Sequence, residues 1–136
     1  MEREKKVLDA SVIIKLFAKE EGSNKALALI NRHVTKKIII IVPELMFLEV
    51  SNAIFYKKAD ENALIRISKD LFNFQFKVEK LTESILNKAI TFSIKNNITI
   101  YDSVYIAIAQ LHGAHLITAD SRLYNLPSVI PLEKTN

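Results

Sequence analysis

Apolar residues occur in short runs separated by stretches of helical spacing. Runs of β-branched or alternating apolar residues predict strands at residues 6–8, 38–42, 76–80, 116–118 and 129–132, the last of which carries a proline. Helical spacing predicts helices at residues 11–18, 23–33, 43–56, 60–72, 82–96 and 102–113. Strands that alternate with helices favour parallel pairing through right-handed crossovers. We therefore expect an α/β fold, a three-layer α/β/α sandwich with a mainly parallel, five-stranded sheet.

Capping residues and turn formers set the predicted helix boundaries. Pro43 suits the first turn of the third helix, because proline has no N–H to leave unpaired there. Asp60, Thr82 and Asp102 are suitable N-caps for the next three helices, and Gly113 ends the last of them.

Composition predicts one globular domain over residues 1–136. The chain has 49% hydrophobic residues, enough for a single core at this length. It has no cysteine, which excludes disulfides and thiolate metal ligands. The longest apolar run, residues 38–42, is far shorter than the roughly 20 residues of a membrane span. We expect a cytoplasmic protein, and its net charge of +4 permits a polyanionic partner without requiring one.

Four acidic residues are candidates for a shared site. Asp9, Asp102 and Asp120 follow short apolar runs, and the carboxyl ends of parallel strands line the ligand crevice of α/β sheets. Taken singly, each of these three also suits an ordinary helix N-cap. Glu49 lies in a very apolar helix, where an unpaired carboxylate is costly. We expect a positive group near Glu49, with Asn52, one turn further on, as its polar companion.

Convergence of the four carboxylates would require a compensating charge. Two carboxylates about 4 Å apart repel by about 4 kcal/mol at an effective dielectric of about 20. A hard divalent cation relieves that repulsion, and oxygen donors without imidazole or thiolate suit Mg²⁺ or Mn²⁺. The pattern indicates phosphoryl-transfer chemistry.

Four segments carry a family resemblance over essentially the whole chain. They read VLDASVIIKL at residues 7–16, LEVSNA at 48–53, YDSVYIA at 101–107 and LITADSRL at 116–123. In this order and spacing they resemble the signature blocks of PIN-domain ribonucleases, most closely the VapC-like toxins of type II toxin–antitoxin systems.

The resemblance implies an activity and a set of site residues. Asp9, Glu49, Asp102 and Asp120 would be the catalytic and metal-binding acids around Mg²⁺, for which Mn²⁺ can substitute. The implied supporting residues, whose polar groups orient the carboxylates, are Ser11, Asn52 and Thr118. The implied reaction is hydrolysis of RNA phosphodiester bonds, leaving 3′-hydroxyl and 5′-phosphate ends.

Binding partners are also indicated, in part by the resemblance and in part by the positions of two basic residues. Lys15 and Arg122 lie within about one helical turn of residues of the implied metal site and are candidates for gripping the RNA backbone. Similarity to the toxins implies an antitoxin partner and a homodimer. The apolar circumference of residues 43–58 is compatible with such contacts.

Three alternatives remain open at this level. A phosphoacceptor receiver domain also gathers acids at strand ends, but it needs an acidic pair after the first strand, where only Asp9 stands. A catalytically silent PIN-like module would bind RNA or protein without cutting. A PIN nuclease could also process RNA without an antitoxin.

Overall fold

The computed structural model describes residues 2–136 and contains a five-stranded, all-parallel sheet. Residue 1, the first position of the expected domain, lies outside the described part. The strands run in the order β3-β2-β1-β4-β5. Their bounds are β1 (Glu4–Leu8), β2 (Ile38–Pro43), β3 (Lys77–Glu79), β4 (His115–Thr118) and β5 (Val129–Pro131). The predicted parallel sheet is confirmed, with the short β3 at an edge as expected.

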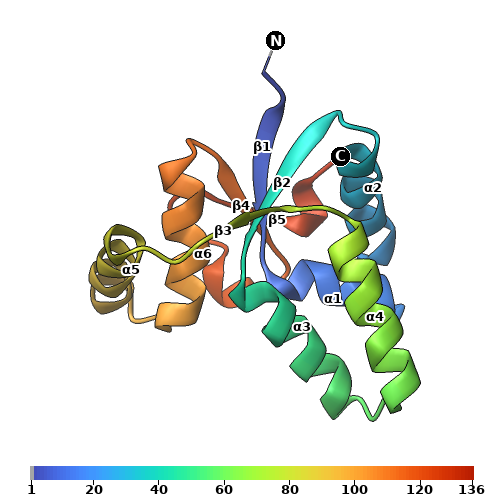
Figure 1. Cartoon of the computed structure of the whole chain (residues 1–136). Helices are drawn as coiled ribbons and strands as arrows, with labels where there is room; N and C mark the ends of the chain where they lie inside the picture. The colour runs from blue at the N-terminus through green and yellow to red at the C-terminus, as the bar shows by residue number, and fades with distance from the viewer. Residues whose placement is uncertain (1) are drawn as a thin grey trace.

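Six α-helices surround this sheet within residues 2–136. They are α1 (Ala10–Ala18), α2 (Ser23–Val34), α3 (Leu45–Tyr56), α4 (Glu61–Asn73), α5 (Glu83–Asn96) and α6 (Ile100–Leu111). Two 3₁₀ turns, Ser121–Leu123 and Leu132–Lys134, follow β4 and β5. Figure 1 shows α5 and α6 on one side of the sheet and α1, α2 and α4 on the other, while α3 extends beyond the carboxyl ends of the strands. This arrangement is the predicted three-layer sandwich.

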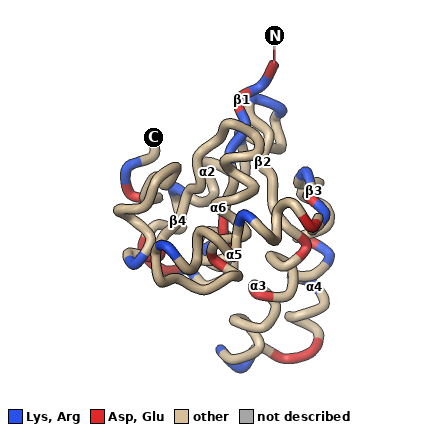
Figure 2. The backbone as a smooth tube through the Cα atoms, turned by 90° about the vertical axis from the view of Figure 1, so that its left-hand side faces the viewer, with Lys and Arg blue, Asp and Glu red and all other residues tan. Residues whose placement is uncertain are grey.

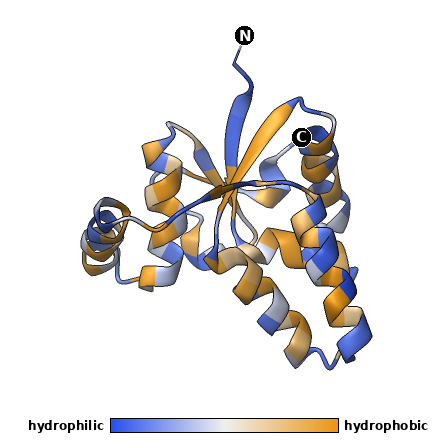
Figure 3. Ribbon diagram, viewed as in Figure 1, coloured by the Kyte–Doolittle hydropathy of each residue, from blue (hydrophilic) through white to orange (hydrophobic). Residues whose placement is uncertain are grey.

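The core is formed by the central strands and by buried residues of all six helices, of which α6 contributes the longest run. The apolar residues of β2 are buried almost completely, and so is the run from Ser103 to Ala109 in α6. Figure 3 shows β2 hydrophobic along its length, whereas the N-terminal half of β1 is hydrophilic. Burying one large aliphatic side chain stabilises a fold by roughly 1.5–3 kcal/mol. Helix α6 is therefore fixed firmly against the sheet.

Three predicted boundaries are wrong, each for a local reason. Pro43 is the last residue of β2, since a strand end tolerates the missing N–H, and α3 begins after it. Thr99, not Asp102, caps α6, because its hydroxyl accepts a hydrogen bond from the Asp102 backbone N–H at 3.1 Å. The apolar run at 98–101 is consequently a helix entry and not a strand. The last strand stops at Pro131, because Leu132 begins a 3₁₀ turn.

The topology places one crevice at the centre of the sheet. From β1 the chain moves outward to β2 and β3, and it then returns to β4 and β5 on the other side of β1. The strand order therefore reverses between β1 and β4, where α/β sheets bind ligands at the carboxyl ends. Asp9 directly follows β1, and Asp120 follows β4 by two residues.

Within residues 2–136, every helix is too short or too polar to cross a membrane.

Candidate functional site

Asp9 lies at the centre of a hydroxyl network that joins β1 to β4. Its side chain is only 6% exposed, and the hydroxyls of Ser11 and Thr118 donate to its two carboxylate oxygens. Ser11 Oγ also accepts from the Ala119 backbone N–H at 3.0 Å, and Thr118 Oγ1 accepts from the Asp120 N–H at 3.0 Å. Asp9 occupies the N-cap position of α1, as predicted, but its carboxylate makes no capping hydrogen bond there. The structure places Ser11 and Thr118 where the sequence predicted supporting groups.

Burial changes the ionisation of Asp9. Loss of solvent raises the pKa of its carboxyl from 3.8 to about 6, although the Ser11 and Thr118 hydroxyls favour the charged form. The negative charge of Asp102 raises the pKa further. Asp9 is thus a buried carboxylate whose partners are neutral hydroxyls, which makes it receptive to a cation.

Glu49 projects from α3 and is half-buried. Its Oε1 accepts a hydrogen bond from the Tyr105 phenol at 2.6 Å. Burial raises the pKa of Glu49, the phenol opposes this shift, and the charge of Asp102 adds to it. The prediction of a positive side chain beside Glu49 is therefore wrong, because the structure supplies a neutral phenol in that place.

Asn52 is not the companion of Glu49. It is exposed on α3, and among residues 2–136 its side chain makes no hydrogen bond within the protein. Tyr105 was missed at the sequence level because it lies 56 residues from Glu49. Its apolar neighbours in α6 made it resemble an ordinary core aromatic.

Asp102 and Asp120 share Arg122. Arg122 Nη2 lies 2.5 Å from Asp120 Oδ2 and 3.7 Å from Asp102 Oδ2. Asp120 also accepts from the Arg122 backbone N–H at 3.0 Å and so caps the 3₁₀ turn after β4. The side-chain hydrogen bond from Arg122 holds the pKa of Asp120 below its usual value. Burial raises the pKa of Asp102, which also feels the charges of Arg122 and Asp120.

The four acids form one electrostatic group with Asp102 at its centre. Burial is the largest cause that raises the pKa values of Asp9, Glu49 and Asp102, and the charge of a second carboxylate adds to it in pairs that all include Asp102. In the arrangement described for residues 2–136, no three acidic or imidazole groups are placed to hold a single ion together. Mg²⁺ commonly uses only one or two carboxylates and completes its shell with waters and phosphate oxygens. The all-oxygen donor set fits such an ion, while a ligand set of all four acids stays a prediction.

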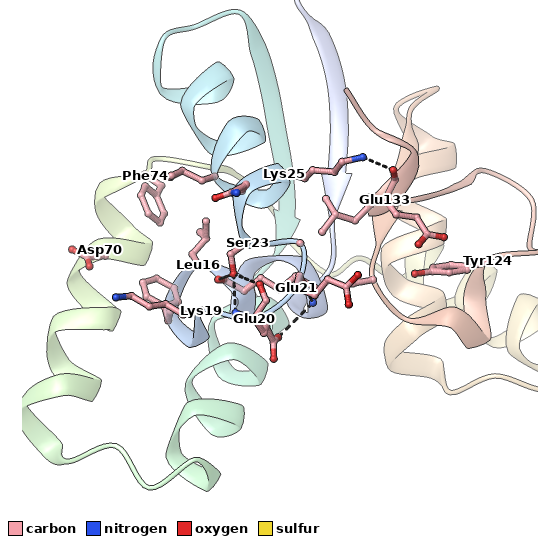
Figure 4. Close-up of a pocket in the computed structure, with 17 residues that line it drawn as sticks. Leu16, Lys19, Glu20, Glu21, Ser23, Lys25, Asp70, Phe74, Tyr124 and Glu133 are labelled. Atoms are coloured by element: carbon pink, nitrogen blue, oxygen red, sulfur yellow. Dashed lines mark hydrogen bonds and ion pairs between the residues drawn. The ribbon is translucent and has the colours of Figure 1, made fainter.

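A groove of about 1110 Å³ is lined mainly by residues of α1, of α2 and of the loop between them, and none of the four acids lines it. Figure 4 shows Lys19, Lys25, Glu133 and Tyr124 among its lining side chains. Ala119, which precedes Asp120, also lines the groove and places one end of it beside the acidic group. The groove could admit an extended polar ligand.

Lys15 lies at this groove but is already engaged. Its ammonium donates to the Glu21 carbonyl at 2.6 Å and pairs with Glu20 at 3.6 Å. Both candidates for gripping RNA, Lys15 and Arg122, therefore have partners within the chain.

Comparison with known proteins agrees with this geometry. The PIN domain family model matches residues 6–129. The ribonuclease VapC3 of Pyrobaculum aerophilum is 31% identical over 127 residues, covering 88% of this chain and 92% of that protein.

Solved structures share the fold at lower sequence identity. A Pyrobaculum aerophilum protein is 22% identical, with a TM-score of 0.72 and coverage of 96% of this chain and 85% of its own. A toxin–antitoxin complex from Klebsiella pneumoniae contains a chain that is 17% identical, with a TM-score of 0.68 and coverage of 93% and 96%. The sarcin–ricin-loop-cleaving toxin VapC20 of Mycobacterium tuberculosis is 13% identical, with a TM-score of 0.67 and coverage of 85% and 90%. Because the family model spans most of the sequence and a curated relative is similar over nearly its full length, this chain belongs to the PIN-domain family.

Proposed function

We propose that this protein is a metal-dependent endoribonuclease that hydrolyses RNA phosphodiester bonds as the toxin of a toxin–antitoxin pair. One observation carries the proposal: Asp9, a carboxylate buried at the switch point of the sheet, is coupled to Asp102, which is coupled in turn to Glu49 and Asp120, and no basic side chain of residues 2–136 pairs with Asp9. The similar protein VapC3 is named a ribonuclease, which supports the same activity here.

The chain's own groups have separable roles in this proposal. Asp9, Glu49, Asp102 and Asp120 are the oxygen donors that would hold Mg²⁺ or Mn²⁺. When bound, such an ion supplies Lewis-acid activation of water and neutralises charge that develops on the phosphate. Ser11 and Thr118 fix the two oxygens of Asp9 and so keep that carboxylate in one orientation. No histidine is required, and the products would carry 3′-hydroxyl and 5′-phosphate ends.

The groove beside the acids is the proposed path of the RNA. Lys15, Lys19 and Lys25 line it together with acidic side chains, and Tyr124 offers an aromatic surface on which a base can stack. Figure 2 shows that Lys and Arg are spread over the molecule, from the start of β1 to the far end of α3 and α4. Because the basic residues are dispersed, this distribution favours contact with a short stretch of RNA over binding along a continuous basic surface.

An antitoxin and a second copy of the chain are the proposed protein partners. Similar folds occur in the toxin–antitoxin complex from Klebsiella pneumoniae, which supports the first of these. Helix α3 exposes Leu48, Phe55 and Tyr56, and an exposed apolar patch of this kind commonly marks a protein interface. An RNA substrate would place the activity in the cytoplasm.

The proposal is tested by incubating purified protein with total cellular RNA in Mg²⁺, in Mn²⁺ and in EDTA. Wild-type protein should cut only with metal, and Asp102→Asn should lose at least about a hundred-fold in rate, because it removes the acid shared by every coupled pair. Asp60→Asn is the matched control, since Asp60 caps α4 through Ala63 and an asparagine caps equally well.

Three further results would decide against the proposal. Equal cutting by wild type and Asp102→Asn would indicate a contaminating nuclease. Products that end in 2′,3′-cyclic phosphate would exclude attack by water. Metal and RNA binding without cutting of any RNA would favour the catalytically silent module.

A further inference from the structure

Tyr105 makes a contact that core packing does not require. Its side chain is only 1% exposed in the middle of α6, yet its hydroxyl reaches Glu49 Oε1 on α3 at 2.6 Å. Asp102 lies three residues earlier on the same helix, about one turn away. Tyr105 therefore links Glu49 on α3 to the rigid, buried helix α6, which also carries Asp102.

The hydroxyl is fixed as the donor in this contact. A phenol ordinarily has a pKa of about 10, and an ionised carboxylate can only accept, so the O–H of Tyr105 donates to Glu49 Oε1. The phenol consequently keeps its proton at any physiological pH. A donor to a carboxylate forms a short, charge-assisted hydrogen bond, which fixes the direction of the acceptor oxygen.

Glu49 needs such a fixed partner more than Asp9 and Asp120 do. The Asp9 oxygens are held by two hydroxyls, and Asp120 is held by Arg122. Among residues 2–136, Tyr105 supplies the only side-chain hydrogen bond to Glu49, and Oε2 accepts none. A phenylalanine would fill the same core space, so the hydroxyl serves Glu49 and not the packing.

We propose that Tyr105 is a positioning residue of this site. Its phenol O–H holds Glu49 Oε1 and thereby keeps the second oxygen of that carboxylate available beside Asp102 for a divalent cation. The inference rests on the proposed function, since it assigns Glu49 a role at the metal.

The test removes only the hydroxyl, with Tyr105→Phe. Mn²⁺ binding to the metal-free protein is measured by calorimetry, and RNA cleavage is measured separately as kcat and KM. Groups that orient metal ligands typically contribute about ten-fold or more to affinity or activity. We expect Mn²⁺ to bind about ten-fold more weakly and kcat to fall by a similar factor with KM nearly unchanged.

A double-mutant cycle separates positioning from general stability. In Glu49→Gln, which already lacks the carboxylate charge, adding Tyr105→Phe should change Mn²⁺ affinity by less than about two-fold. Ser93→Ala is the matched control, because it removes a buried hydrogen bond between α5 and α6, Ser93 Oγ to Ser103 Oγ at 2.6 Å. It should lower the melting temperature without weakening Mn²⁺ binding.

The outcomes distinguish this inference from the proposed function. Wild-type Mn²⁺ affinity in Tyr105→Phe, or an equal loss in the Glu49→Gln background, would overturn the positioning role even if RNA is cut. Weaker Mn²⁺ binding in Tyr105→Phe by a protein that cuts no RNA would support the positioning role and remove the nuclease. Absence of Mn²⁺ binding by the wild type would overturn both.

Discussion

Asp9 shows how the candidate site lowers the stability of the fold at neutral pH. Its folded-state pKa of about 6 lies above the ordinary value of 3.8, so the folded protein retains a proton that the unfolded chain has already lost. The stability associated with this proton is fully present below pH 3.8 and is lost as the pH rises through about 6. Asp9→Asn should therefore raise the free energy of unfolding at pH 7, by up to about 3 kcal/mol in metal-free buffer.

Urea unfolding in EDTA at acid and neutral pH checks this prediction. The advantage of Asp9→Asn should shrink toward the acid end. Asp120→Asn should behave in the opposite way, because Arg122 lowers the pKa of Asp120 and so stabilises the ionised folded form at neutral pH. Identical pH dependence in wild type and Asp9→Asn would show that burial does not shift the Asp9 carboxyl.

Removal of Arg122 should have opposite effects on the binding of Mn²⁺ and of RNA. Arg122 pairs with Asp120 and approaches Asp102, but its side chain is 71% exposed, so its loss should change stability by less than about 1 kcal/mol. Arg122→Ala removes a fixed positive charge beside the acids, and we expect Mn²⁺ to bind several-fold more tightly, because like charges repel. RNA affinity should fall, with a salt slope reduced by about one if the guanidinium contacts a phosphate.

Calorimetry and filter binding at several salt concentrations measure these two effects. Arg122→Lys is the control, since it retains the charge and should bind Mn²⁺ nearly as the wild type does. Weaker Mn²⁺ binding in Arg122→Ala would instead mean that Arg122 orients Asp102 and Asp120 for the ion.

At this scale, the sequence identified carboxylates more readily than their partners. Short apolar runs marked Asp9 and Asp120, because strand ends are visible in local hydrophobicity. The partner of Glu49 was assigned to Asn52 from helical spacing, whereas α3 turns that residue outward. Tyr105 could be found only from the tertiary packing of α3 near α6, which local periodicity does not encode.

Among the elements, the entry of α6 is the one on which the site depends most. Thr99 Oγ1 accepts from the Asp102 N–H at 3.1 Å, and Thr82 Oγ1 accepts from the Ile85 N–H at the same distance at the start of α5. Replacing either threonine with alanine removes one cap, which costs about 1 kcal/mol. Only Thr99→Ala also loosens the turn that carries Asp102, so only this variant should lose RNA cleavage and Mn²⁺ affinity.

Thermal unfolding and cleavage assays on the pair test this dependence. Similar losses of melting temperature with unequal losses of activity are expected. Equal activity in the two variants would show that Asp102 is held by the body of α6 and not by its cap. Thr99→Ser should restore both properties, because the serine hydroxyl caps as well as that of threonine.

Element boundaries were predictable where a single signal acted. Thr82 and Asp60 cap their helices as expected, since each precedes a helical pattern without competing candidates. At α6, the sequence analysis chose Asp102 as the cap, whereas Thr99 caps the helix, and Ile100 and Tyr101 extend its first turn. Pro43 was predicted in the first turn of α3, whereas it continues the apolar run before it as the last residue of β2.

For the whole molecule, the order of strands and helices determined where the acids could meet. Parallel pairing aligns all carboxyl ends on one edge, and the reversal between β1 and β4 opens that edge beside Asp9 and Asp120. The sequence predicted this edge without predicting the strand order. Helix α3, which extends beyond the carboxyl ends of the strands, carries Glu49, and α6, on one side of the sheet, carries Asp102 (Figure 1).

The shape of the molecule also leaves α3 with more apolar surface than its own core contact uses. Leu48 is 71% exposed and Tyr56 is 73% exposed, beside an exposed Phe55 whose ring packs edge-on against that of Tyr56. A stable dimer buries about 800 Å² per partner, and apolar side chains on a projecting helix provide the centre of such an interface.

The double variant Phe55→Glu, Tyr56→Glu should therefore sediment as a monomer at concentrations where the wild type is a dimer. Ile94→Glu on α5, at an equally exposed position, is the control and should remain dimeric. A wild type that sediments as a monomer at high concentration, or a dimer lost only in Ile94→Glu, would remove α3 from the interface.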